Sequence, residues 1–332
     1  MNMKKFNGFK RISAILPLMV LLVACGSDDD DDSIGNWVER SSLNGKARSS
    51  AVSFVIDNKG YISTGYDGDD YRVDTWQYDI SGDYWVQVAD FTGTARSSAA
   101  SFVVGGKGYV GTGYDGTNEL GDFFKYDPDA NSWSQVADFP DDPRRGGVGF
   151  AGTSYGFFGS GTDGDNDRKD FWKYDPSLDN WTEVVGFGGG KRHDATTFTI
   201  DNMVYFGTGV SNSTYLTDFW SFNTDTEVWT RLEELDDDDD YDVVRSNAAG
   251  FAINGYGYVA CGVYSSQINS VWEYDPSNDT WEEKTDFELT TRRDPVAFSN
   301  GTQGYVLLGR NGTSYLDDMM EFYPFDEYDD ED

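Results

Sequence analysis

Residues 96–113 read RSSAASFVVGGKGYVGTG, and the pattern of this stretch recurs about every 48 residues along a chain of 332 residues. In each of six copies an Arg is followed by Phe after six residues, by an aromatic residue after thirteen and by Gly after seventeen. The arginines are Arg48, Arg96, Arg144, Arg192, Arg245 and Arg292. Self-similarity at about 50 residues with strand-like content is typical of a β-propeller. The sequence therefore predicts one repetitive domain.

All ten tryptophans fall on two positions of the repeat. The first position holds Trp37, Trp85, Trp133, Trp181, Trp229 and Trp281, and the second holds Trp76, Trp172, Trp220 and Trp272. A large aromatic side chain that recurs at a fixed position buries much apolar area in the same way each time. This regularity indicates packing within and between blades.

Each repeat contains four short strands separated by turn residues. In the second copy the expected strands are 99–104, 107–114, 122–127 and 132–137, with Gly105-Gly106 and Asp115-Gly116 in the connections. No stretch has apolar residues at helical spacing over enough residues to predict a helix in place of these strands. The fold class predicted is all-β, a six-bladed propeller.

The N-terminal end of the repeat region predicts how the ring closes. Trp37 precedes Arg48 by eleven residues, as Trp85 precedes Arg96, so residues 34–43 are an outer fourth strand. The last repeat ends after its third strand, 319–325, with no Trp behind it. We expect the N-terminal strand to complete the sixth blade, because an open ring would expose unpaired strand edges.

The pattern resembles the kelch repeat over residues 34–325. Kelch units share an Arg ahead of the innermost strand, a Tyr before a glycine doublet, and a downstream Tyr and Trp about seven residues apart. Tyr126 and Trp133 keep that last spacing, whereas the doublet is Thr112-Gly113. The resemblance implies a six-bladed kelch-type propeller.

The first 24 residues are typical of a secretory signal. Four basic residues precede the apolar run Ile12–Ala24, which is too short to span a bilayer. The run ends in Leu22-Val23-Ala24-Cys25, which resembles the lipobox of bacterial lipoproteins and implies that Cys25 carries the lipids. An ordinary signal peptide with an incidental Cys is the alternative.

The residues that follow Cys25 are expected to form an acidic tether, 25–33. Its Asp28–Asp32 run resembles the surface-export signal of Bacteroidetes lipoproteins, and such a charge run is also a flexible, solvated linker. We therefore expect an outer membrane lipoprotein that faces the cell exterior and contacts the membrane through its anchor only. A second acidic segment, 326–332, is expected to be a charged tail.

Charge and cysteine content exclude several classes of partner and bond. Without residues 1–24 the chain has 21 basic and 59 acidic side chains, a net charge of −38. Such a field repels nucleic acid and anionic membrane surfaces. If Cys25 is lipidated, Cys261 alone remains, which excludes an intramolecular disulfide.

The kelch resemblance raises two enzymatic possibilities. Kelch propellers include copper enzymes of the galactose oxidase type, but that site needs two histidines and this chain has one, His193. They also include sialic acid mutarotases, which need a general acid and a general base within reach of a sugar. The sequence favours a binding or scaffold protein for a protein or glycan, without a cofactor, and a mutarotase-type enzyme is the alternative.

Ligand contacts are expected at the mouth of the channel. If the strands run as in kelch folds, each repeat Arg stands there, on the face that carries the loops between second and third strands. The candidate contacts are the six repeat arginines together with His193, Tyr66 and Tyr114. In the alternative interpretation each Arg pairs with a carbonyl or carboxylate of a neighbouring blade and only holds the ring together.

One loop has an arrangement of carboxylates that partly matches a calcium site. Asp163, Asp165 and Asp167 alternate, with Asp170 beyond, and acidic loops rich in oxygen suit Ca²⁺. Arg168 stands where such loops usually have Gly. Calcium is therefore the one ion that the sequence suggests.

Overall fold

The computed structural model describes residue 1 and residues 34–237 and 241–329. Within these ranges the chain forms strands, turns and loops, and it contains no helix that could cross a membrane. The expected signal peptide, Cys25, the tether with its Asp28–Asp32 run, and residues 330–332 of the acidic tail lie outside the described residues.

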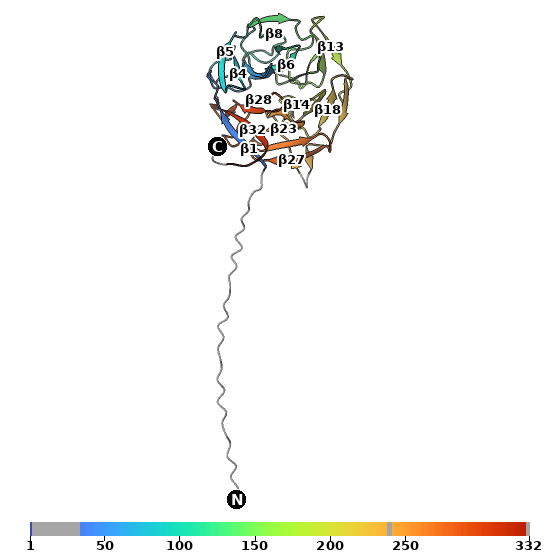
Figure 1. Cartoon of the computed structure of the whole chain (residues 1–332). Coiled ribbons are helices and arrows are strands. Elements are labelled where there is room, and N and C mark those ends of the chain that lie inside the picture. The colour runs from blue at the N-terminus through green and yellow to red at the C-terminus, as the bar shows by residue number, and fades with distance from the viewer. Residues whose placement is uncertain (2–33, 238–240, 330–332) are drawn as a thin grey trace. The chain divides into compact units, whose positions relative to one another are not determined.

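Six four-stranded antiparallel sheets form the blades, which surround a central axis (Figure 1). Blade 1 consists of β2 (Val52–Ile56), β3 (Lys59–Ser63), β4 (Thr75–Asp79) and β5 (Tyr84–Val88). Blade 2 consists of β6 (Ala100–Val104), β7 (Lys107–Gly111), β8 (Phe123–Asp127) and β9 (Ser132–Val136). Blade 3 consists of β10 (Val148–Ala151), β11 (Gly156–Gly159), β12 (Phe171–Asp175) and β13 (Asn180–Val184).

The second half of the ring has the same plan. Blade 4 consists of β14 (Thr196–Ile200), β15 (Met203–Gly207), β18 (Trp220–Asn223) and β19 (Val228–Arg231). Blade 5 consists of β22 (Ala249–Ile253), β23 (Tyr256–Ala260), β26 (Val271–Asp275) and β27 (Thr280–Lys284). Blade 6 consists of β28 (Val296–Ser299), β29 (Gly304–Leu307), β32 (Met319–Glu327) and, as its outer strand, β1 (Ile34–Arg40).

Short two-stranded ribbons decorate the loops of blades 4 to 6. They are β16–β17 (Val210–Ser211, Thr214–Tyr215), β20–β21 (Asp236–Asp237, Tyr241–Asp242), β24–β25 (Val263–Tyr264, Ser266–Gln267) and β30–β31 (Arg310–Asn311, Ser314–Tyr315). Blades 1 to 3 have tight turns at the positions of the first, third and fourth ribbons. Apart from the outer strand of blade 6, the two halves of the ring therefore differ in their loops.

The predicted closure of the ring is confirmed. β1 pairs antiparallel with β32, and Trp37 lies opposite Phe322. The Trp37 side chain is fully buried between Phe287 and Phe322, and its indole N–H donates to the Thr285 carbonyl. The N-terminal strand thus brings into blade 6 the tryptophan that the other blades receive from their own fourth strands.

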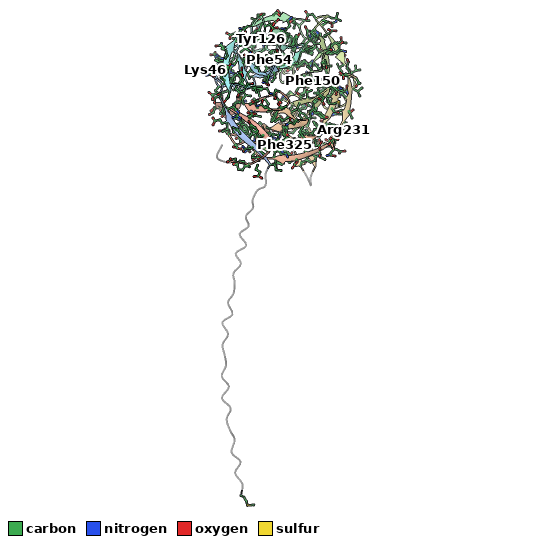
Figure 2. The ribbon with its side chains drawn as sticks, viewed as in Figure 1. Lys46, Phe54, Tyr126, Phe150, Arg231 and Phe325 are labelled. Carbon is green, nitrogen blue, oxygen red and sulfur yellow. The ribbon has the colours of Figure 1, made fainter. Side chains whose placement is uncertain are left out.

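Aromatic side chains fill the spaces between blades, as the tryptophan positions predicted. In blade 1, Phe54 of β2 stacks on Tyr61 of β3 at a centroid distance of 5.1 Å, and Tyr61 meets Tyr126 of the next blade at 5.6 Å. Each blade repeats this contact, the sixth blade meeting the first through Tyr305 and Tyr78. Figure 2 shows the side chains of the ring as sticks, with Phe54 and Tyr126 among those labelled.

Two closed rings of backbone hydrogen bonds join the blades at one end of the channel. In the first, the residue two positions after each repeat Arg donates its N–H to the equivalent carbonyl of the preceding blade. These residues have positive φ angles: Ser50, Ser98, Gly146, Asp194, Asn247 and Asp294. In the second, the Gly at the end of each second strand donates to the repeat Arg carbonyl of the next blade. Both rings run through all six blades, so a break in one interface affects the whole frame.

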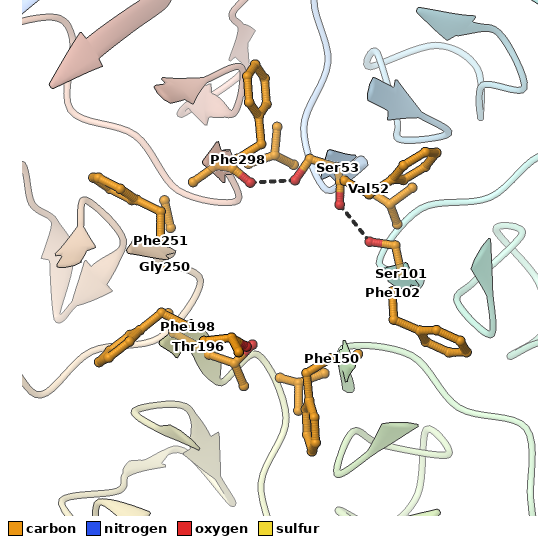
Figure 3. A pocket seen from close by; sticks show the side chains of 18 of the residues that line it. Val52, Ser53, Ser101, Phe102, Phe150, Thr196, Phe198, Gly250, Phe251 and Phe298 are labelled. Atoms are coloured by element: carbon orange, nitrogen blue, oxygen red, sulfur yellow. Dashed lines mark hydrogen bonds between the residues drawn. The ribbon is translucent and has the colours of Figure 1, made fainter. Parts of the chain in front are cut away.

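The innermost strands line a central cavity of about 510 Å³. Their phenylalanines point away from the axis into the blades, whereas small side chains such as Ser53 and Ser101 face it (Figure 3). The Ser101 hydroxyl donates to the Ser53 carbonyl and the Ser53 hydroxyl to the Ala297 carbonyl, so polar groups on the wall bridge neighbouring blades. The pocket with chemically diverse side chains lies at one end of this channel.

Candidate functional site

The six repeat arginines are buried, with at most 1% of each residue exposed. Arg96 is typical: Nη1 donates to the Thr112 carbonyl at 2.9 Å and to Asp122 Oδ1 at 2.6 Å, while Nε donates to the Thr94 carbonyl. A ligand in the pocket cannot reach such a guanidinium group. The structure therefore does not support the expectation that Arg48, Arg96, Arg144, Arg192, Arg245 and Arg292 contact a ligand.

These arginines instead fix the start of each third strand to the end of the second. In blade 1, both terminal nitrogens of Arg48 donate to Asp74, at 2.9 and 2.6 Å. Burial opposes the ionisation of Asp74, but its hydrogen bonds and its charge interaction with Arg48 lower its pKa to about 2. This is the holding role of the alternative interpretation, with the difference that the carboxylate belongs to the same blade.

The channel mouth is surrounded by residues from three positions of the repeat. These positions lie one, eighteen and about twenty-three residues after the repeat Arg. The first position holds Ser49, Ser97, Arg145, His193, Ser246 and Arg293. The second holds Tyr66, Tyr114, Thr162, Val210, Val263 and Arg310, each bridged to the first through its backbone. The third holds Tyr71, Glu119, Asp167, Tyr215, Gln267 and Tyr315. A constant frame thus presents a different set of side chains on each blade.

Residues from these positions line a pocket of about 630 Å³. On blades 6, 1 and 2 its wall is an arc of tyrosines, with centroid distances of 5.8 Å from Tyr315 to Tyr66, 4.8 Å from Tyr66 to Tyr71 and 6.2 Å from Tyr71 to Tyr114. Arg145 of blade 3 lies over the Tyr114 ring at 4.5 Å and forms an ion pair with Glu119. The arc ends at this cation.

The loops of blades 1 to 3 at the channel mouth share one turn. The Asp67 side chain accepts hydrogen bonds from the backbone N–H groups of Asp69 and Asp70, and Asp115 and Asp163 do the same in the next two blades. Gly68, at φ 102°, lies under Tyr315, because a Cβ there would be 2.7 Å from the tyrosine ring. The Asp of each Asp-Gly pair therefore fixes the turn, and the Gly leaves room for the side chain of the neighbouring loop.

His193 and carboxylates form the wall on blades 3 and 4. His193 Nδ1 is 3.0 Å from Asp194 Oδ2, and Nε2 is 3.7 Å from Asp167 Oδ1. The hydrogen bond to Asp194 raises the pKa of His193, and burial opposes this effect. Asp167 also accepts a hydrogen bond from the Ser211 hydroxyl, so it joins the loops of the two blades. This wall can hold and exchange a proton.

A pair of arginines forms the wall on blade 6. The Nε atoms of Arg293 and Arg310 lie 3.1 and 3.3 Å from the same oxygen, Asp294 Oδ2. The other oxygen of Asp294 accepts a hydrogen bond from Asn247 at 2.6 Å. Burial raises the pKa of Asp294, against the opposing effect of the two guanidinium groups.

Some of the candidate residues meet in this pocket. His193, Tyr66, Tyr114, Asp165 and Asp167 line it. Five other charged residues of the lining were not candidates from the sequence: Arg145, Asp194, Arg293, Asp294 and Arg310. The sequence marks them only as departures from the repeat pattern, at positions next to the residues that recur.

The four candidate calcium ligands do not converge. Asp163 bonds to its own turn and to Arg168, Asp167 to Ser211, and the half-buried Asp170 to Arg144 and Trp172. Across residues 34–237 and 241–329 no group of three or more His, Cys, Asp or Glu side chains is placed to hold a metal ion. The structure thus offers no support for a calcium site at this loop.

Comparisons with known proteins agree with the fold. A family model described as the Kelch motif matches residues 95–140, which span the second repeat. The solved structure of YjhT is similar with a TM-score of 0.73 and 15% sequence identity, covering 84% of this chain and 96% of that one. No curated protein matches the sequence. The chain is therefore a six-bladed β-propeller that contains a Kelch motif in its second repeat, and the same pattern of residues recurs in every blade.

Proposed function

We propose that this propeller is a binding protein that takes up a glycan in the pocket at the channel mouth, displayed at the cell surface by a lipid anchor on Cys25. The observation that carries the proposal is the arc of Tyr315, Tyr66, Tyr71 and Tyr114 beside hydrogen-bonding side chains. Tyrosine offers an apolar ring and a polar hydroxyl, the two features that a sugar presents in return.

The shape of the pocket favours a glycan over a flat protein surface. Its volume of about 630 Å³ lies within the range of small-ligand sites, about 300–1,000 Å³. Rigid blades position the loops, so the site is preformed and little ordering is needed on binding. The acidic net charge argues against nucleic acid as the ligand.

A glycan array with the full chain carrying Cys25→Ser would test this proposal. Tyr71→Ala should weaken binding of the captured glycan about fivefold, because stacking on one aromatic ring contributes on the order of 1 kcal/mol. Tyr84→Ala is the matched control, since Tyr84 is 50% exposed on the outer strand β5, away from the pocket. Equal losses for the two variants, or no glycan captured, would contradict the proposal.

The anchor can be tested separately. The lipobox-like sequence that ends at Cys25 supports lipidation, and Cys25→Ser should then release the protein from the membrane fraction. Replacing Asp28–Asp32 by Asn should leave lipidation intact and remove the protein from the cell surface. Unchanged cleavage by external protease after that replacement would contradict the export role.

A mutarotase-type enzyme is the second candidate, and the placement of His193 favours it. An imidazole between Asp194 and Asp167 can accept and return a proton at a sugar hydroxyl, as anomer exchange requires. The test is NMR exchange spectroscopy of sialic acid anomers with the full chain carrying Cys25→Ser. Acceleration that His193→Gln abolishes would support the enzyme, and no acceleration would leave binding as the function.

A further inference from the structure

We propose that Arg293 and Arg310 form a subsite for an oxyanion, a carboxylate or sulfate group carried by the ligand. The inference rests on the proposed glycan binding and adds to it that the glycan is acidic and that its charged group faces blade 6.

The backbone holds the two arginines side by side. Each residue donates its N–H to the carbonyl of the other, at 3.0 Å in both directions. Both side chains use Nε to contact Asp294 Oδ2, and no hydrogen bond of their terminal Nη groups occurs within the described residues. The forked ends of both guanidinium groups are therefore available to a ligand.

The charge of this cluster is unbalanced. Arginine remains protonated in proteins, so on blade 6 two positive charges face one carboxylate, that of Asp294, and the next carboxylate that acts on Asp294 is Asp194 of blade 4. Asp294 has no free oxygen left, since Asn247 occupies Oδ1. Arg145 elsewhere in the pocket has its own acidic partner in Glu119. The blade 6 wall thus carries about one positive charge in excess.

Both side chains are open to the pocket. They are 37% and 32% exposed, whereas the side chain of Asp294 beneath them is only 10% exposed. A planar guanidinium group matches the geometry of a carboxylate or sulfate and can bond it with two parallel hydrogen bonds. Tyr315 lies next to Arg310 in the same wall, so a sugar ring on the tyrosine arc would place its acidic substituent at the pair.

The remainder of the molecule makes such a subsite selective. A formal net charge of −34 repels small anions from the surface at large, so an anion gains affinity only where positive charge is concentrated. Two exposed arginines over one buried carboxylate create that local condition. A neutral sugar would lose nothing by the repulsion and would gain nothing from the pair.

The first arm of the test uses inorganic sulfate as the probe, measured by calorimetry on the full chain carrying Cys25→Ser at constant ionic strength. Sulfate should bind, and Arg293→Gln together with Arg310→Gln should weaken it at least tenfold. Arg231→Gln with Lys46→Gln removes the same charge from exposed positions at the edge of the ring and should have little effect (Figure 2). Sulfate affinity that is absent, or equal in the two double variants, would overturn the subsite.

A second measurement does not depend on the folding of the variants. In the unmodified pocket, the NMR signals of the Arg293 and Arg310 Nε–H groups should shift on titration with sulfate, while the buried Arg96 signal should stay in place. Absence of these shifts would count against the subsite even if sulfate binds elsewhere.

The glycan arm compares galactose with galacturonate, two sugars that differ only in the carboxylate. Galacturonate should bind more tightly, and the double Arg variant should remove that preference. Sulfate binding at the pair without any sugar binding would leave the subsite standing and reject glycan recognition. Sugar binding without a preference for the acid would reject the subsite alone.

Discussion

Arg245 is the one repeat arginine that lacks a carboxylate partner within the described residues. The other five have an Asp at the start of the third strand, whereas blade 5 has Ser270, which offers a hydroxyl and a carbonyl. Burial lowers the pKa of Arg245 to about 10. In blade 1 the equivalent indole N–H, that of Trp76, donates to Asp74, whereas the indole N–H of Trp272 has no acceptor among the described residues. Blade 5 therefore contains a buried guanidinium group without the directly bonded carboxylate that its five equivalents have.

Ser270→Asp should stabilise the protein. The new carboxylate would pair with Arg245 and accept from Trp272, as Asp74 does for Arg48 and Trp76, and hydrogen bonds to charged groups contribute about 1.5–3 kcal/mol. Thermal unfolding would measure the gain. Ser270→Asn is the control, since it adds an acceptor without charge, and an Asp variant no more stable than the Asn variant would contradict the charge argument.

Asp74→Asn should show the opposite effect and a dependence on pH. At neutral pH the loss should be about 3–5 kcal/mol, because Arg48 is left buried without its counter-charge. The folded pKa of about 2 lies below the unfolded value of about 3.9, so the carboxylate stabilises the protein above pH 4 and this contribution disappears as the pH falls toward 2.

Denaturant unfolding at several pH values would check this dependence. The difference in unfolding free energy between the original protein and Asp74→Asn should narrow between pH 5 and pH 2. Asp69→Asn, at an exposed position of the same loop, should stay close to the original protein throughout. A difference that does not change with pH would mean that the ionised form of Asp74 is not what stabilises the blade.

The residues that recur and the residues that line the pocket belong to different sets, and this limits what the sequence could predict. A side chain present in all six copies performs one task six times, and for Arg48 and its equivalents the task is to hold the blade. A ligand at the axis is not six-fold symmetric, so each blade faces a different part of it. Its contacts therefore come from residues that differ from one repeat to the next. Arg145 and His193 stand where blades 1 and 2 have Ser.

At the scale of elements, the position and order of the strands were predictable from the repeat, and their ends were less so. The second strand of blade 2 was expected to run over 107–114 but ends at Gly111. Thr112 adopts a φ of 58°, and Gly113 then donates to the carbonyl of Arg144 in the next blade. The left-handed residue interrupts the ladder so that the chain can join two blades.

The closing strand β1 allows a test at the same scale. Deleting residues 34–43 should strongly destabilise the ring, because it removes Trp37, a loss of about 3–5 kcal/mol, and leaves β32 as an exposed edge. Moving the same ten residues to the C-terminal end through a short linker should restore most of the stability. The Asp329 N–H donates to the Asn36 side chain, so the two ends already lie together.

Melting temperatures of the truncated and the permuted chains would decide the matter. In the permuted chain, blade 6 would be built from four consecutive strands, as the other five blades are. If the truncated chain melts at the temperature of the intact protein, the pairing of β1 with β32 contributes nothing to thermal stability. The deletion could lower the melting temperature without the permuted chain restoring it. In that case the end of the chain from which the strand enters blade 6 matters more than its presence.

At the scale of the whole molecule, a rigid ring with two complete circles of hydrogen bonds carries a very large negative charge. The formal net charge is −34, and self-repulsion of this size destabilises a compact state. The Arg–Asp pairs inside the blades are buried and therefore weakly screened, whereas most of the excess carboxylates are at the surface. Added salt should therefore mainly weaken the repulsion between the surface carboxylates.

Raising sodium chloride from about 10 mM to about 500 mM should therefore raise the melting temperature, because the screening length falls from about 30 Å to a few Å. A protein held together mainly by surface ion pairs would respond in the other direction, so a falling melting temperature would contradict this account. Calcium chloride at matched ionic strength serves as a further arm. If screening alone operates, calcium and sodium should give nearly equal shifts, whereas a shift that saturates at low calcium concentration would reveal a bound ion and reopen the acidic loops as its site.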